Sequence, residues 1–249
     1  MMAAACSWSE PPVNLILGEK DVHVWCASLD RPTSTVQSYA GLLSDDEQER
    51  AKRFHFSRDR DHFIISRGLL RKLLGRYLAI KPILLEFHYT RYGKPFLQGC
   101  SEGSVVNFNL SHSHGKVIIA ITRGREVGID IEHIRTVPEA DHIAEQNFSC
   151  GEYAAYQSLP ESRKQQGFFN CWTRKEAFIK AVGEGLSLPL DQFEVSLAPD
   201  EPAKLKYIEG DPGGIARWSL QALKINADYA AAIVVEGTNC RIVCYEWTD

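Results

Sequence analysis

The sequence contains no apolar run that approaches the roughly 18 residues of a transmembrane helix. Its first residues show no basic segment followed by an apolar core, so they do not resemble a signal peptide. We therefore expect no membrane span and a cytoplasmic protein. The seven cysteines include no CxxC pair, which argues against a zinc site or a disulfide framework and favours reduced thiols.

An excess of positive charge is also absent. The chain carries 28 Lys and Arg against 32 Asp and Glu, a formal net charge of −4. This balance argues against a dedicated nucleic-acid binder or a polybasic membrane protein. At 249 residues and 44% hydrophobic content, the chain can bury one large core or two small ones. Any anion must therefore be bound by a local cluster.

Sequence patterns predict the same order of elements in both halves, namely strand, short helix, long helix and further strands. In the first half, these are a strand at 22–29, a helix from a capping box at Ser44, a long helix near 60–78 and strands at 84–89, 106–111 and 116–122. In the second half, they are a strand at 127–132, helices at 142–148, 149–159 and 168–183, and strands at 193–197, 218–224 and 229–235, with an edge strand at 241–247. The pattern predicts an α+β fold of two similar lobes, 1–124 and 125–249, with a ligand cleft between them.

The strand Val127–Glu132 carries two acidic residues on one face. Val127, Ile129 and Ile131 point one way, so Gly128, Asp130 and Glu132 point the other. The two carboxylates repel each other unless a cation or water lies between them, and the glycine permits something to approach closely. A solvated strand face is the simpler interpretation.

The helix within Phe168–Gly185 carries charges on a face that is otherwise apolar. Lys175 falls inside the apolar arc, Glu176 borders that arc, and Lys180 shares a face with Glu176 four residues earlier. The alternative is a lysine that extends its ammonium to solvent beside a surface Glu/Lys pair.

Three further places can supply ligands for an anion. Arg67 lies on the apolar face of its helix, as a core salt bridge or as an anion ligand. The turn Tyr92–Pro95 holds Lys94 outward, a position more often simply solvated. Ser111 and His112 end a strand, where they can bind a phosphate or a ribose or form a hydrophilic turn.

Together these residues indicate a metal-assisted reaction on a polyanion. Asp130, Glu132 and Glu176 offer the oxygen ligands that suit Mg²⁺, or Mn²⁺. Basic groups around such a site imply a phosphoester or pyrophosphate held by the metal on one side and by Lys, Arg and His on the other.

Three blocks of the sequence resemble the Sfp-type 4′-phosphopantetheinyl transferases. They are Tyr92–Pro95 with Phe108–Ser113, Val127–Glu132, and Trp172–Lys180, in the family's order and spacing, and the resemblance runs from about Leu42 to Leu197. The resemblance implies two lobes related by a pseudo-twofold axis, with the active site at their seam, in a monomer. It also implies transfer of the 4′-phosphopantetheine arm of coenzyme A to a serine of an acyl or peptidyl carrier protein, with release of adenosine 3′,5′-bisphosphate.

The resemblance also implies roles for individual residues. Asp130, Glu132 and Glu176 would bind Mg²⁺, Glu176 would also be the base, and Lys180 would stabilise charge on the pyrophosphate. The residues implied to contact coenzyme A are Arg67, Gly93, Lys94, Pro95, Ser111, His112, Lys175 and Lys180.

The chain departs from the family pattern near its first helix. Where the bacterial prototype has lysines for the nucleotide 3′-phosphate, this chain has Glu47 and Arg50, so Arg53 or Arg67 would substitute. Glu152 matches a glutamate that the family keeps near the site. We expect the carrier protein to dock at the region Phe148–Tyr156.

Two rival functions fit the same residues. A metal-dependent phosphodiesterase or nuclease would release nucleotide without a carrier protein. A non-catalytic module that binds coenzyme A or a carrier protein would keep the basic groups but tolerate the loss of Glu176.

Overall fold

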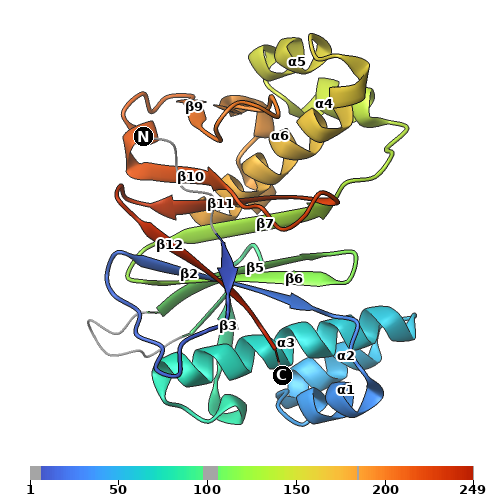
Figure 1. Ribbon diagram of the computed structural model, residues 1–249, viewed down its shortest axis with the longest axis vertical. Coiled ribbons are helices and arrows are strands. Elements are labelled where there is room, and N and C mark those ends of the chain that lie inside the picture. The colour runs from blue at the N-terminus through green and yellow to red at the C-terminus, as the bar shows by residue number, and fades with distance from the viewer. Residues whose placement is uncertain (1–6, 98–105, 184, 249) are drawn as a thin grey trace.

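The computed structural model describes residues 7–97, 106–183 and 185–248. It has four layers, in which two central sheets face each other and helices cover the outer face of each sheet (Figure 1). The α+β class with two lobes is confirmed. No helix within these described ranges is long and apolar enough to cross a membrane.

The first lobe contains a five-stranded sheet in the order β1-β12-β2-β6-β5. Its strands are β1 Trp8–Ser9, β2 Asp21–Ser28, β5 Val106–Ser113, β6 Lys116–Arg123 and β12 Arg241–Glu246. The helices are α1 Thr33–Ala40, α2 Asp45–Lys52 and α3 Ser57–Leu78. A 3₁₀ turn, Pro82–Leu84, leads into a hairpin of β3 Phe87–Tyr89 and β4 Pro95–Leu97, so the strand expected at 84–89 is shorter.

The second lobe contains a three-stranded antiparallel sheet in the order β10-β11-β7 and a separate hairpin β8-β9. Its strands are β7 Val127–His133, β8 Phe193–Val195, β9 Leu205–Ile208, β10 Trp218–Ala222 and β11 Tyr229–Glu236. The helices are α4 Ala140–Asn147, α5 Cys150–Gln157 and α6 Glu161–Val182, with short 3₁₀ turns at Gly185–Ser187, Leu190–Gln192 and Gly214–Arg217.

Three hydrophobic clusters join these layers. One lies between the first sheet and α1–α3, and a second between the other sheet and α4–α6. The third lies between the two sheets, where Val24 and Ile118 from one meet Ile129 and Ile233 from the other. Strands β2 and β6 are therefore buried on both faces, which explains why Lys116–Thr122 reads as a continuous apolar run.

The two lobes repeat one helical unit. An eight-residue helix with a capping box, α2 or α5, precedes a 22-residue helix, α3 or α6. The boxes pair Ser44 with Glu47, as the sequence predicts, and Ser149 with Glu152. Gly183 ends α6 with a φ of 81°, a left-handed conformation that favours glycine.

The last strand corrects one expectation. β12 is not an edge strand of the second lobe, because it pairs in parallel with β2 and lies between β1 and β2 in the first sheet. Its sequence fixes its strand character but not its partner. The division of the chain at 124/125 stays a prediction, and residues 241–246 pack with the first lobe.

The cysteines agree only in part with the expectation of reduced thiols. Cys26, Cys150, Cys171 and Cys240 are free, and Cys26 and Cys171 are buried. Cys244 is disulfide-bonded.

Candidate active site

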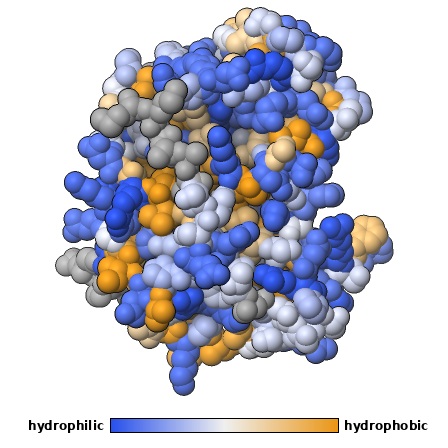
Figure 2. Space-filling model, viewed as in Figure 1, coloured by the Kyte–Doolittle hydropathy of each residue, from blue (hydrophilic) through white to orange (hydrophobic). Residues whose placement is uncertain are grey.

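A cleft of about 540 Å³ lies where the lobes meet. The space-filling view shows a notch in the outline between the lobes (Figure 2). The cleft is lined by Arg50, Phe63, Ser66, Arg67, Gly93, Pro95, Leu110, Ser111, His112, Asp130, Glu132, Trp172, Glu176 and Lys180. An adjoining pocket of about 390 Å³ shares Gly93, Pro95, Glu176 and Lys180 with it and adds Lys94.

The close approach expected at Gly128 is made by α6. A Cβ at this position would overlap the backbone of Ala177 and Ala181, so only glycine lets the helix lie directly on β7. This contact brings the face of α6 that carries Glu176 and Lys180 against the face of β7 that carries Asp130.

Lys180 is held beside Asp130. Its Nζ lies 2.6 Å from Asp130 Oδ1 and 3.2 Å from Ser111 Oγ, and the Ser111 hydroxyl also donates to Asp130 Oδ1 at 2.8 Å. Asp130 is 4% exposed, and its second oxygen, Oδ2, is buried without a hydrogen-bond partner. One carboxylate oxygen therefore stays available in the wall of the cleft.

The other two carboxylates are electrostatically coupled to Asp130. Burial raises the pKa of Glu176 above its usual 4.5, Lys180 opposes the shift, and the charges on Asp130 and Glu132 add to it. Burial also raises the pKa of Glu132, against a hydrogen bond from Ser113. Mutual repulsion of this kind is what a cation between the groups would relieve.

The residues fit a divalent ion, although no ion site is already assembled. Within the described ranges, no group of three or more His, Cys, Asp and Glu side chains is placed to hold a metal. The fit comes from the donor chemistry, since Asp130, Glu132 and Glu176 supply oxygen ligands to one cleft and Asp130 Oδ2 lacks a partner.

The polar face of β5 joins the two lobes. β5 and β7 belong to different sheets, yet the Ser113 hydroxyl donates to Glu132 Oε2 at 2.9 Å and accepts from the backbone N–H of His133. Asn109 Oδ1 accepts from the Ile129 N–H at 3.0 Å. The alternation of residues along β5 indicated this face, but the sequence did not show that it would meet β7, so Ser113 was missed.

Lys94 does not extend into solvent as its turn suggested. Its Nζ donates to Glu126 Oε2 at 2.8 Å, and Asn107 binds the other oxygen of Glu126. Gly93 has a φ of 83°, which lets the turn place Lys94 beside the C-terminal end of α6, where Nζ reaches the Ala181 carbonyl oxygen.

His112 lies at the end of β5 and also lines the cleft. Loss of solvent around the imidazole is the main cause that lowers its pKa from 6.5, and the positive charge of Lys180 lowers it further. Histidine in this state is a neutral hydrogen-bonding group at physiological pH.

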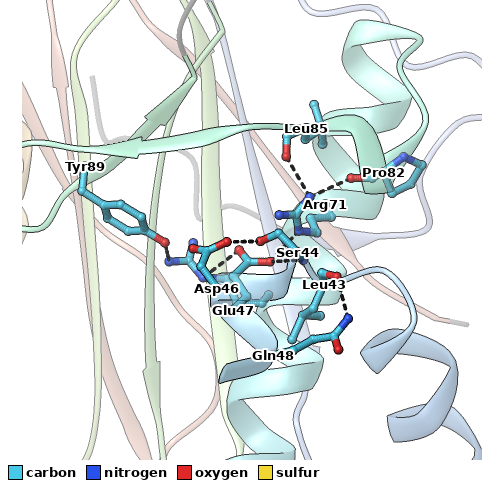
Figure 3. Close-up of polar contacts among 10 residues, drawn as sticks. Leu43, Ser44, Asp46, Glu47, Gln48, Arg71, Pro82, Leu85 and Tyr89 are labelled. Carbon is cyan, nitrogen blue, oxygen red and sulfur yellow. Dashed lines mark hydrogen bonds and ion pairs between the residues drawn. The ribbon is translucent and has the colours of Figure 1, made fainter. Parts of the chain in front are cut away.

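Arg67 forms a core salt bridge and also lines the cleft, although it is buried. It is 6% exposed, its Nε lies 3.6 Å from Glu47 Oε1, and its Nη2 donates to the Tyr89 hydroxyl at 2.7 Å. Glu47 also accepts from Arg71 Nε at 2.7 Å. Figure 3 shows Tyr89 and Arg71 on opposite sides of Glu47. The atom Arg67 Nη1 is buried and has no hydrogen-bond partner.

The structure corrects the assignment of Lys175. This residue is 1% exposed and lines neither pocket, and its ammonium binds Glu152 at 2.7 Å and the carbonyl oxygens of Leu190 and Phe193. Neighbouring residues on a helix point about 100° apart, so Glu176 faces the cleft while Lys175 faces the core. Glu152, 3% exposed, is therefore part of the interior of the second lobe.

The region expected as the docking surface for a carrier protein is buried at both ends. Phe148 is 4% exposed and Tyr156 is 2% exposed, and both belong to the core of the second lobe. Their aromatic rings pack on Phe168 of α6. Between the two ends, Ala154 and Ala155 are exposed, so docking at this region stays a prediction.

Comparisons with known proteins identify the family of the chain. A sequence model of the 4′-phosphopantetheinyl transferase superfamily matches residues 126–234, and a model of the N-terminal part of a 4′-phosphopantetheinyl transferase matches residues 31–123. The chain belongs to the 4′-phosphopantetheinyl transferase family and is of the Sfp type.

Curated relatives match most of the chain. The 4′-phosphopantetheinyl transferase HetI of Nostoc sp. is 39% identical over 231 residues, which cover 93% of this chain and 94% of HetI. The 4′-phosphopantetheinyl transferase Sfp of Bacillus subtilis is 31% identical over 198 residues, which cover 74% of this chain and 86% of Sfp. Among solved structures, a Chronobacterium ammoniagenes ACPS-CoA complex matches 46% of this chain and 98% of its own, with 20% identity and a TM-score of 0.35.

Proposed function

We propose that this protein transfers the 4′-phosphopantetheine arm of coenzyme A to a serine hydroxyl of an acyl or peptidyl carrier protein. Membership of the family supports the activity. The observation that carries it here is the cleft between the lobes, which has acidic residues on β7 and α6 and cationic or hydrogen-bonding residues on α3 and β5.

Coenzyme A would lie across the seam with its charged groups toward these residues. The Gly93–Pro95 turn, Ser111 and His112 line the walls that would contact the nucleotide and pyrophosphate. Arg67, with its unpaired Nη1, is our candidate for the 3′-phosphate, and Arg50 lines the same cleft.

Asp130, Glu132 and Glu176 would hold Mg²⁺, which supplies charge neutralisation at the pyrophosphate when bound. Glu176 would take the proton of the attacking serine hydroxyl, since its carboxylate lines the cleft next to the proposed metal site. The serine oxygen forms a bond to the β-phosphorus while that phosphorus loses its bond to adenosine 3′,5′-bisphosphate. Lys180, beside Asp130, would stabilise the charge that develops on the leaving group.

The proposal also covers the rival function, the oligomeric state, the location and the pathway. The relatives are transferases, and nothing in the comparisons favours a phosphodiesterase. We propose that the protein is a monomer in the cytoplasm and that it serves fatty-acid, polyketide or nonribosomal peptide synthesis. None of these pathways is distinguished by the residues of the cleft.

Mass spectrometry of the carrier protein tests the activity. The protein is incubated with coenzyme A, Mg²⁺ and an apo carrier, and we expect the carrier to gain the mass of one phosphopantetheinyl group. A carrier whose acceptor serine is replaced by alanine is the control. Unchanged mass with carriers from all three pathways contradicts transfer, and nucleotide release without a carrier would favour the phosphodiesterase.

A further inference from the structure

The cluster of Glu47, Arg67 and Arg71 carries more positive than negative charge inside the protein. One carboxylate faces two guanidinium groups, so the three side chains keep one net positive charge. They are 2%, 6% and 1% exposed. An excess charge so far from solvent is costly unless a further anion completes the cluster.

Of the two guanidinium groups, Arg67 is the one for which a buried nitrogen without a hydrogen-bond partner is found among the described residues. Arg71 donates to Glu47 and, through Nη1, to the carbonyl oxygens of Pro82 and Leu85 at 2.9 Å each. Arg67 has no equivalent backbone acceptors. Its Nη1 lacks a partner, and it is the member of the pair that lines the cleft.

The hairpin β3-β4 holds Arg67 from the other side. The Tyr89 hydroxyl accepts the hydrogen bond from Nη2, and the rings of Phe87 and Tyr89 lie 5.4 and 5.6 Å from the guanidinium carbon, within the range of cation–π attraction. Tyr89 directly precedes the turn that carries Gly93 and Lys94, so the hairpin that lines the cleft also fixes Arg67. In Figure 3 a dashed line joins the Tyr89 hydroxyl to a guanidinium nitrogen, which is the hydrogen bond from Arg67 Nη2.

We propose that Tyr89, with Glu47 opposite, is a positioning residue that aims Arg67 at a terminal phosphate and so makes the enzyme prefer coenzyme A to 3′-dephospho-coenzyme A. This inference rests on the proposed function, since it assigns the anion to the 3′-phosphate of that substrate. Tyr89 does not contact the phosphate; it fixes the guanidinium plane, and Glu47 supplies the opposing charge. A planar guanidinium binds phosphate well only when its orientation is set.

Tyr89→Phe removes only the hydroxyl, and it is compared with Tyr207→Phe on the exposed strand β9. We expect Tyr89→Phe to raise the KM for coenzyme A about tenfold, the size of effect that follows from loss of one charge-assisted hydrogen bond. The kcat should stay within about twofold and the KM for 3′-dephospho-coenzyme A should not change, because that substrate lacks the phosphate. Tyr207→Phe should change neither constant.

A double-mutant cycle with Arg67→Gln separates positioning from a structural role. If Tyr89 acts through Arg67, Tyr89→Phe has no further effect on KM in the Arg67→Gln protein. Three outcomes would each overturn the proposal: equal effects of Tyr89→Phe on both substrates, an effect on kcat instead of KM, or no effect at all. If the Arg67→Gln protein does not fold, the comparison of the two substrates still tests the proposal, because it needs no Arg67 variant.

Calorimetric dissociation constants for the two coenzymes keep this test independent of turnover. A wild-type protein that binds coenzyme A but modifies no carrier would contradict the proposed function. The same Tyr89→Phe comparison of dissociation constants would still decide whether this residue sets the preference for the phosphate.

Discussion

The glutamate that ends each capping box holds the long helix in both lobes, but the surroundings of the two glutamates differ in charge. Glu47 of α2 binds Arg71 of α3, and Glu152 of α5 binds Lys175 of α6, each at 2.7 Å. Both glutamates therefore cap their own helix and anchor a long helix against it. In each pair the glutamate lies at the start of the short helix, and its partner on the long helix lies 24 residues later in the first lobe and 23 residues later in the second. The same polar contact therefore holds the repeated helical unit in both lobes.

The copies differ one turn earlier on the long helix. Four residues before Arg71 stands Arg67, a second cation, whereas four residues before Lys175 stands Cys171, which is neutral and fully buried. The pair in the second lobe is thus balanced and closed to the cleft, and the cluster in the first lobe retains a charge for a ligand. The difference between Arg67 and Cys171, at equivalent positions of α3 and α6, therefore distinguishes a cluster that can bind a ligand from an ion pair that is only structural.

The largest effect is expected on stability, when the buried ion pair of Glu152 and Lys175 is broken. Glu152→Gln leaves the ammonium of Lys175 buried without a counter-charge, which should lower the free energy of unfolding by about 3–5 kcal/mol. Denaturant unfolding measures the loss, and Glu145→Gln on the exposed face of α4 is the control. A loss near zero would show that the second lobe does not depend on this pair.

Lys175 and Glu176 are adjacent on α6, but we expect a change at Glu176 to lower turnover without lowering stability. Glu176→Gln keeps the shape and leaves Lys175 paired, so we expect unchanged unfolding but turnover at least about a hundredfold lower, as loss of a base or metal ligand commonly gives. Steady-state kinetics of carrier modification gives the rate. Near-normal turnover would remove Glu176 from the mechanism.

The binding role of the first lobe predicts changes in KM. Lys94→Ala and His112→Ala should each raise the KM for coenzyme A by about tenfold while kcat changes little, because each removes a contact made equally in the ground and transition states. Arg217→Ala, outside both pockets and paired with Asp211, serves as the control. An unchanged KM would reject the assignment of either residue.

His112 should give coenzyme A binding a pH dependence of several fold. Its pKa lies below 6.5 because of burial and the charges of Lys180 and His62, with Asp130 opposing. At neutral pH the imidazole is uncharged, so the affinity for the phosphates should rise as pH falls below 6.5 and the imidazolium forms. Dissociation constants measured from pH 5 to 8, about the range over which histidine titrates, should lose this rise in His112→Ala; a slope kept by the variant would assign it to another group.

The smallest effect should come from removing the hydrogen bond between Ser113 of β5 and Glu132 of β7, where the two lobes meet. Ser113→Ala removes the hydrogen bond that lowers the pKa of Glu132, so this carboxylate becomes harder to ionise. We expect Mn²⁺ to bind about threefold more weakly, the size of effect typical of outer contacts to metal ligands or smaller. Titration followed by electron paramagnetic resonance measures this directly, and Ser158→Ala, at the exposed end of α5, should leave it unchanged.

The sequence predicted the residues of the cleft that lie on regular elements. Asp130, Glu132, Glu176 and Lys180 were found because strand and helix periodicity assigns them to faces, and the cleft brings these faces together. The helical pattern placed Lys175 inside the apolar arc, where it lies, but its coenzyme A contact was implied only by the family resemblance, and its partner Glu152 lies on another helix.

Contacts between distant segments could not be predicted in this way. Tyr89 meets Arg67 across 22 residues through the geometry of a hairpin, and β12 pairs with a strand more than 200 residues earlier. Periodicity records which face of an element is buried, but it does not record which partner buries it.

The return of β12 to the first sheet means that two short connections, residues 124–126 and 237–240, join the lobes. They run side by side, since Arg125 donates to the Glu236 carbonyl oxygen and Glu236 donates its N–H to Glu126. The covalent links between the lobes therefore lie together at the start of β7, near the contact of Lys94 with Glu126. At the far end of β7, a side-chain hydrogen bond joins Glu132 to Ser113 of the first lobe.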